Sequence, residues 1–228
     1  MTGLRLSAVD RDEALLEALS ELYGQTRADF LRGTALGGAA MLAALAAPSD
    51  AVGKVSDLGI LNFGLRFERL QATFYTEAEG IGTIRRMPAD TQRWARVLGA
   101  HERAHVRIFK KVLGRKAERR PVFDFGDATG SQAEFTRTAV AMEDLTVALL
   151  AGVAPRVQDR NLTAALFGLL TTEARHAAWA RHIVGATPVA EAFDEPRTLS
   201  DVAGVVARTR FIARRPKTSV RRRPRFTG

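Results

Sequence analysis

The sequence predicts an all-α protein whose central part is an antiparallel four-helix bundle. Apolar residues recur along four stretches of helical length, and each stretch is bounded by residues that start or stop helices. Each stretch also carries a glutamate near its middle, and in two of them a histidine follows three positions later. Polar residues at matched depths in four helices indicate one shared site inside a bundle.

The first two helices are delimited by capping residues. Ser56 suits the N-cap of the first helix, which is expected to end near Gly80 and Gly82. Pro88 suits the first turn of the second helix, and Gly114 supplies its end. The first half of the bundle is therefore expected between residues 56 and 114.

The third and fourth helices follow the same rules. Ser131 and Glu134 form an S-x-x-E capping box that opens the third helix, which is expected to close around Gly152. The fourth helix is expected to begin within residues 155–159 and to run to Gly185.

The connections between these helices predict the topology. The short connections at 80–88 and 152–159 favour antiparallel hairpins, whereas the stretch from Arg115 to Gly130 is long enough to cross the bundle. The sequence therefore predicts two hairpins joined by one long crossover.

The central polar residues form a regular set: Glu68, Glu102-x-x-His105, Glu143 and Glu173-x-x-His176. Positions i and i+3 of a helix lie about 60° apart around the axis, so each Glu/His pair points the same way. The first of these residues lies about 12 to 14 positions, or roughly 18 to 21 Å, into each helix. All six side chains are therefore expected in one layer.

Four glutamates facing an apolar core are costly when ionised without cations, because each carboxylate loses hydration. Two divalent ions balance their charge, and without metal such a cluster is expected to take up protons. Mixed carboxylate and imidazole ligands suit iron or manganese. The alternative is that these residues lie on solvated helix faces, as most charged residues do.

Other polar residues near this set are less specific. Tyr75 lies two turns beyond the first glutamate, as a core tyrosine or as a group that hydrogen-bonds a ligand or carries an oxidising equivalent. Gln71 and Glu79 share its stripe and are candidates for an ion path. His101 and His182 point away from the set and are expected at the surface or in an outer layer.

Four segments carry a family resemblance: LNFGLRFERLQATFYTEAEG, HERAHVRIFKKVLG, RPVFDFGDATGS and TTEARHAAWARHIVG. From about residue 57 to residue 211 the chain resembles the ferritin-like superfamily, and in particular bacterial, exported, desiccation-associated ferritin-like domain proteins. The resemblance implies a ferritin-like bundle whose metal ligands are Glu68, Glu102, His105, Glu143, Glu173 and His176.

The function implied by the resemblance is a di-iron carboxylate protein that reacts with O2 or peroxide, an oxidoreductase of the ferroxidase or oxidase type. One alternative is a di-manganese, catalase-like protein that removes peroxide, and another is a non-enzymatic stress or envelope scaffold. By analogy, Glu102 and Glu143 are expected to bridge the ions, Glu68 and Glu173 to be terminal, and each histidine to bind one ion. The chain has no cysteine, which excludes an attached Cys₄ rubredoxin-like centre. A homo-oligomer is compatible with this interpretation.

Residues 1–55 are interpreted as a leader. The sequence TRADFLR precedes an apolar run at 34–47 that contains Ala44-Leu45-Ala46, which resembles a twin-arginine export signal. Ala28 stands where the second arginine belongs, so the signal is degenerate. Export to the periplasm or cell envelope is predicted, or a cytoplasmic location if the signal is not functional. The alternative is an Ala-rich helix that packs on the bundle or tethers it to a membrane.

Three further segments follow: the bundle at 56–186, a C-terminal segment at 187–211 that packs on it, and a basic, disordered tail at 212–228. Nine of the 34 basic residues follow Asp201, and the other 25 balance the 25 acidic residues. The excess charge is thus interpreted as a tail property. Such a tail suits contact with anionic lipid or cell-wall polymer. A specific nucleic-acid function is not expected, because Phe226 is the one aromatic residue in the run.

Overall fold

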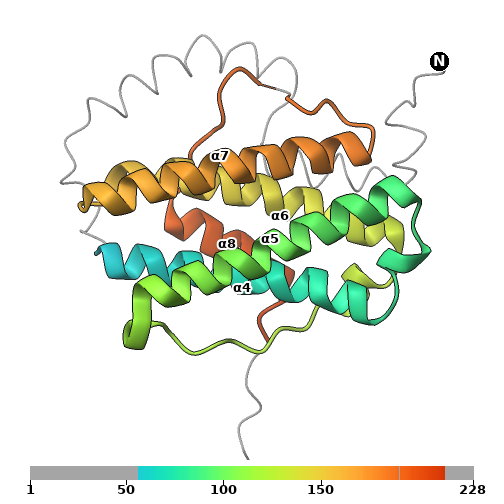
Figure 1. Ribbon diagram of the computed structural model, residues 1–228, viewed down its shortest axis with the longest axis horizontal. Coiled ribbons are helices and arrows are strands. Elements are labelled where there is room, and N and C mark those ends of the chain that lie inside the picture. Colours follow the sequence, from blue (N-terminus) through green and yellow to red (C-terminus); the bar gives the residue numbers. More distant parts are fainter. Residues whose placement is uncertain (1–55, 190, 214–228) are drawn as a thin grey trace, which may run out of the picture.

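The computed structural model describes residues 56–189 and 191–213. Its long helices lie side by side, and a shorter helix lies against them (Figure 1). The helices are α4 (Asp57–Gly80), α5 (Ala89–Leu113), α6 (Gln132–Val153), α7 (Arg160–Ile183) and α8 (Leu199–Thr209). The predicted all-α four-helix bundle is confirmed. The proposed export signal and nearly all of the basic tail lie outside the described residues.

Local chemistry explains where the long helices begin and end. The Ser56 side chain accepts a hydrogen bond from the Gly59 amide at 3.2 Å and caps α4. Asp159 accepts from two backbone amides at the start of α7. Gly114 has a φ of 53°, a left-handed conformation that suits glycine, and ends α5. These boundaries agree with the predicted ones.

The predicted capping box of α6 forms only in half. The Ser131 side chain accepts from the Glu134 amide at 3.2 Å, as expected. The Glu134 carboxylate instead forms an ion pair with Arg137, one turn further along the helix. A charged partner makes a stronger hydrogen bond than a neutral backbone amide, which explains the difference.

The long crossover between α5 and α6 runs along the outside of α4 (Figure 1). The Glu118 amide donates to Asn62 Oδ1 at 2.8 Å, and Arg69 donates to the Glu118 carbonyl at 2.6 Å. These bonds satisfy the backbone of the extended segment. The crossover connects the α4/α5 hairpin to the α6/α7 hairpin, as predicted.

An aromatic layer fills the core next to the central glutamates. Phe74, Tyr75, Trp94 and Phe135 are each 0% exposed. The rings of Phe74 and Phe135 stack with centroids 5.0 Å apart, and Trp94 meets Phe135 edge to face at 5.8 Å. This layer excludes water from one side of the polar residues described below.

α6 is the one described helix that is long and apolar enough to cross a membrane by length and composition. An 18-residue window within Gln132–Arg156 has a mean hydropathy of 1.4, and 67% of that window is buried inside the bundle. A helix in the middle of a bundle core has the same composition. We therefore interpret α6 as a core helix.

The segment after α7 packs on α6 and the crossover. The Arg197 amide donates to the Ala148 carbonyl at 2.9 Å, and a Cβ at Gly152 would lie 2.0 Å from the Arg197 carbonyl oxygen. Glycine at this position therefore permits the close approach. Further on, Ala213 donates to the Val122 carbonyl at 3.0 Å, so the C-terminal segment holds the crossover in place.

Basic side chains also line the outer face of α5. The exposed members are Arg93, Arg96, Arg107, Lys110 and Lys111. The acidic residues of α5 are Asp90 and the buried Glu102. α5 therefore presents a basic face, while the excess of basic over acidic residues still lies after Asp201.

Candidate metal centre

The structure brings all six predicted ligand residues together in the middle of the bundle. Their exposed fractions are 2% for Glu68, 0% for Glu102, 8% for His105, 0% for Glu143, 0% for Glu173 and 3% for His176. They come from α4, α5, α6 and α7, so each long helix contributes. The alternative of solvated positions is excluded by this burial.

The six residues form two overlapping groups whose ligand atoms all lie within 4.8 Å of one another in each group. The His105 group consists of Glu68, Glu102, His105 and Glu173. The His176 group consists of Glu102, Glu143, Glu173 and His176. Two carboxylates therefore belong to both groups, and each group adds one carboxylate and one imidazole of its own.

The shared carboxylates present one oxygen to each imidazole. Glu102 Oε2 lies 3.6 Å from His105 Nδ1, and Glu102 Oε1 lies 3.2 Å from His176 Nδ1. Glu173 Oε1 lies 3.0 Å from His105 Nδ1, and Glu173 Oε2 lies 3.3 Å from His176 Nδ1. This is the arrangement expected of ligands that bridge two ions.

The expectation that Glu143 is shared and Glu173 is terminal is therefore wrong. Glu143 Oε2 lies 3.5 Å from His176 Nδ1, and Glu68 Oε2 lies 3.2 Å from His105 Nδ1. Each of these two carboxylates belongs to one group. The glutamates of the two E-x-x-H pairs project between the histidines, whereas those of α4 and α6 approach from outside.

Two neutral side chains hydrogen-bond the cluster carboxylates. Tyr75 donates to Glu143 Oε1 at 2.7 Å, and Gln71 donates to Glu102 Oε2 at 3.2 Å. Tyr75 is thus both a core tyrosine and a partner of the cluster. Gln71 and Tyr75 lie three and seven positions after Glu68 on α4, and this helical spacing places both side chains on the same face as Glu68.

Of the remaining two histidines, one contacts the cluster. His101 Nδ1 lies 2.9 Å from His176 Nε2, and His182 is exposed on the last turn of α7. Helical spacing within α5 could not predict the contact between His101 and His176, because His176 belongs to α7. Glu79 forms an ion pair with Arg103 at 3.2 Å at the side of the bundle.

Burial acts to raise the pKa of the carboxyl groups of Glu68, Glu102 and Glu143, whereas contacts with the imidazoles lower it. Burial, with the neighbouring Glu102, raises the pKa of Glu68 well above its usual value. Burial and the charges of Glu102 and Glu173 raise the pKa of Glu143 to about 8. Burial alone would also raise the pKa of Glu102, but its close contacts with the His105 and His176 imidazoles lower it to about 2.

Both imidazoles are held in the charged form when no metal is bound. Burial alone would lower their pKa values, but the surrounding carboxylates raise the pKa of His105 to about 12 and that of His176 to about 12. The cluster therefore holds protons in place of cations, as the sequence predicted.

Several polar atoms of the cluster have no hydrogen-bond partner in the described part of the chain, so they are better suited to bind metal ions than to bond with one another. Five of them are buried without a hydrogen-bond partner among the described residues: Glu68 Oε2, Glu102 Oε1, His105 Nδ1, Glu143 Oε2 and Glu173 Oε1. Buried polar atoms are nearly always satisfied in native proteins. Two divalent cations between the groups would satisfy all five, and carboxylate with imidazole is the ligand set of di-iron and di-manganese bundles.

Comparison with known families matches residues 56–186 to the model of the ferritin-like domain. The match covers more than half of the chain. This chain belongs to the ferritin-like family. No curated protein matches it. The ferritin-like bundle and its buried Glu/His groups are together compatible with a di-metal site.

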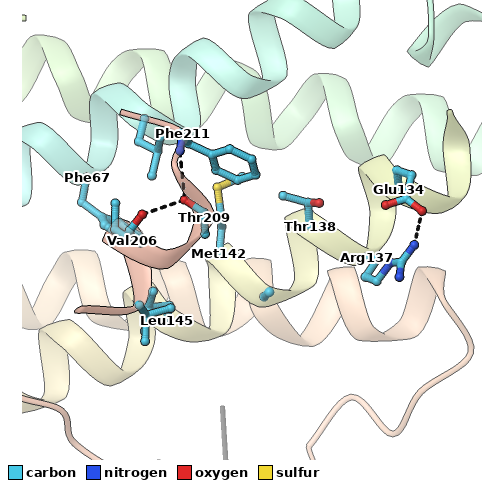
Figure 2. Close-up of a pocket in the computed structure, with 12 residues that line it drawn as sticks. Phe67, Glu134, Arg137, Thr138, Met142, Leu145, Val206, Thr209 and Phe211 are labelled. Carbon is cyan, nitrogen blue, oxygen red and sulfur yellow. Dashed lines mark hydrogen bonds and ion pairs between the residues drawn. The ribbon is translucent and has the colours of Figure 1, made fainter. Parts of the chain in front are cut away.

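A separate apolar groove of about 280 Å³ lies between α4, α6 and α8. Figure 2 shows Phe67, Met142 and Val206 along it, with the paired Glu134 and Arg137 toward one end. None of the six cluster residues lines this groove. The groove therefore does not open directly onto the cluster residues.

Proposed function

We propose that this ferritin-like protein binds two metal ions, in the first place iron, and reacts with O2 or peroxide in the manner of a ferroxidase or oxidase. The observation that carries the proposal is the pair of shared carboxylates. Glu102 and Glu173 each offer one oxygen to the His105 group and one to the His176 group. A site for a single ion would not require two carboxylates that each direct one oxygen to either histidine.

In this proposal the shared carboxylates would hold both ions, and one further carboxylate and one imidazole would complete the ligands of each ion. Glu68 and His105 serve the first ion, and Glu143 and His176 serve the second. Two such ions, when bound, would supply redox chemistry toward O2 or peroxide. The four carboxylates carry the negative charge that offsets the ions in the buried interior.

The chain also prepares the site before any ion binds. Tyr75 and Gln71 hold one oxygen each of Glu143 and Glu102, which limits the orientations of both carboxylates. The aromatic layer excludes water, which strengthens electrostatic interactions inside the cluster. The protons on His105 and His176 must leave when ions bind, since a ligating nitrogen carries no proton.

The proposal is tested by metal analysis of protein purified aerobically from its own host, with O2 and peroxide consumption measured on the same samples. We expect about two iron ions per chain. Glu173→Gln, which neutralises a shared ligand, should lose both ions. Glu118→Gln, at an exposed site on the crossover, is the matched control and should retain them.

The other outcomes separate the alternatives. About two manganese ions with peroxide turnover would indicate a catalase-like protein, because the same ligands suit either metal. Bound metal without consumption of O2 or peroxide would indicate a scaffold. No stoichiometric metal, even after anaerobic loading with Fe(II), would refute the metal centre.

A further inference from the structure

A third histidine lies against the cluster without belonging to either group. His101 immediately precedes Glu102 on α5 but is turned toward α7. Its Nδ1 lies 2.9 Å from His176 Nε2, and the two rings meet edge to edge, with centroids 5.1 Å apart and planes 23° apart. A nitrogen to nitrogen distance of this length is a hydrogen bond.

The orientation of His176 decides which ring donates. Its Nδ1 faces the carboxylates of Glu102, Glu143 and Glu173, at 3.2, 3.5 and 3.3 Å. In the metal-bound form that nitrogen uses its lone pair as a ligand, so the ring proton lies on Nε2. Nε2–H then donates to His101 Nδ1, which acts as the acceptor.

The other imidazole of the cluster lacks this support. His105 also directs Nδ1 at the carboxylates, but no hydrogen bond to its Nε2 is found within residues 56–189 and 191–213. The His105 side chain is 10% exposed, against 4% for His176. The His176 ring is therefore held by a hydrogen bond at Nε2, whereas among the described residues no such bond holds the His105 ring.

We propose that His101 is a positioning residue of the metal centre. By accepting the hydrogen bond from His176 it fixes the tautomer and the ring orientation of that ligand, and so makes the His176 group the tighter of the two ion sites. This inference rests on the proposed function. Water could accept the same bond, but a side chain anchored on α5 also restrains the rotation of the His176 ring.

A role in folding is not needed to explain this position. His101 is exposed, so its ring contributes little to the hydrophobic core. Removing the ring should therefore leave the metal-free fold as stable as before, and its effect should fall on one ion.

The test compares three variants by anaerobic titration with Mn2+, which binds without redox chemistry. His101→Leu removes the acceptor, and His101→Asn keeps an acceptor oxygen near the place of Nδ1. His182→Leu removes an exposed histidine that is remote from the cluster and serves as the control. We expect His101→Leu to weaken one of two ions by about 10- to 100-fold and to leave the other unchanged. His101→Asn should restore binding to within a few-fold of the unmodified protein.

Double variants identify which ion is affected. Glu68→Gln removes a ligand of the His105 group, and adding His101→Leu to it should weaken the one ion that remains. Glu143→Gln removes a ligand of the His176 group, and adding His101→Leu to it should change nothing further.

Three results would overturn the inference: unchanged binding of both ions by His101→Leu, equal loss by the leucine and asparagine variants, or loss of both ions with a lower melting temperature of the metal-free protein. Failure of the proposed function is distinguishable, since the unmodified protein would then bind no Mn2+, which refutes the metal centre and this inference together.

Discussion

The two groups of the cluster have the same kinds of ligands but are held differently by their surroundings. In the His176 group, Glu143 accepts a hydrogen bond from Tyr75 at 2.7 Å, and His176 contacts His101 at 2.9 Å. Both ligands that belong to this group alone are thus fixed from outside. Such outer partners orient ligands and strengthen metal binding.

In the His105 group the corresponding ligands lack outer partners among the described residues. Within residues 56–189 and 191–213, neither Glu68 nor His105 has a hydrogen bond to a side chain outside the six cluster residues. A symmetric ligand pattern in the sequence therefore becomes an asymmetric site in the fold. We expect one ion to bind tightly in the preorganised His176 group and the other to bind more weakly and exchange faster.

The largest difference between the two ions is expected when a carboxylate that belongs to one group alone is removed. Glu143→Gln should abolish the tight ion and leave a weak one, whereas Glu68→Gln should leave the tight ion. Losing a ligand should lower the affinity of its own ion by roughly 100-fold or more, a larger loss than for an outer partner. Equilibrium dialysis against Mn2+ measures both affinities. If the two variants retained ions of equal affinity, the asymmetry would be wrong.

The two groups are expected to behave alike in the metal-free protein, because both imidazoles are then protonated. The pKa values of His105 and His176 are raised to about 12, that of Glu143 is raised to about 8, and that of Glu68 is raised well above 4.5. Groups with raised folded pKa values stabilise the fold below their unfolded values and lose that contribution as the pH rises. Glu102, lowered to about 2, acts oppositely, but only under acidic conditions below about pH 4.5.

We therefore expect the melting temperature of the metal-free protein to fall between about pH 6 and pH 9, as these groups approach their folded pKa values. Metal affinity should rise over the same range, because the ions compete with the protons. Thermal unfolding with and without Mn2+ measures both trends. A metal-free protein whose stability rose over this range would show that the cluster is not proton-loaded.

A smaller effect is expected from the outer partner of Glu143. Tyr75→Phe removes one buried hydrogen bond and leaves Glu143 Oε1 without a donor. The free energy of unfolding should fall by about 1 to 3 kcal/mol, and the tight ion should weaken while the weak ion stays unchanged. Urea unfolding and Mn2+ titration give the two numbers. Equal weakening of both ions would instead indicate a general loosening of the core.

The smallest and most symmetric effect should come from Gln71. Its Nε2 donates to the shared Glu102, but its own Oε1 is buried without a hydrogen-bond partner in the part of the chain that the structure describes. Gln71→Met removes one hydrogen bond together with one unsatisfied atom, so stability should change little. Because Glu102 serves both groups, both ions should weaken by a similar factor in the same Mn2+ titration. A change confined to one ion would show that Glu102 is not shared.

The sequence predicted those features that depend on one helix at a time. Ser56, Asp159 and Gly114 delimit helices through local capping chemistry, and spacing within each helix placed all six cluster residues at one depth. Depth along a helix axis is fixed by a rise of about 1.5 Å per residue. These predictions therefore did not require any knowledge of how the helices pack.

The features that were missed depend on distances across the bundle. The sharing of Glu173 rather than Glu143 follows from how far each carboxylate reaches between α5 and α7. The contact of His101 with His176 likewise joins two helices that are far apart in sequence. No pattern within one helix reports such a distance. The capping box forms only in half because the Glu134 carboxylate pairs with Arg137 instead of the backbone amide of Ser131.

The most direct test of the central claim is a crystal structure of the protein grown with limiting and then with excess Mn2+, with the metal located by anomalous scattering. We expect two peaks in the bundle core, roughly 3.5 to 4 Å apart between the carboxylates of Glu102 and Glu173. At limiting metal the peak beside His176 should be the stronger. The absence of any peak among the six cluster residues, with their carboxylates paired only to the protonated histidines, would contradict the two-metal account.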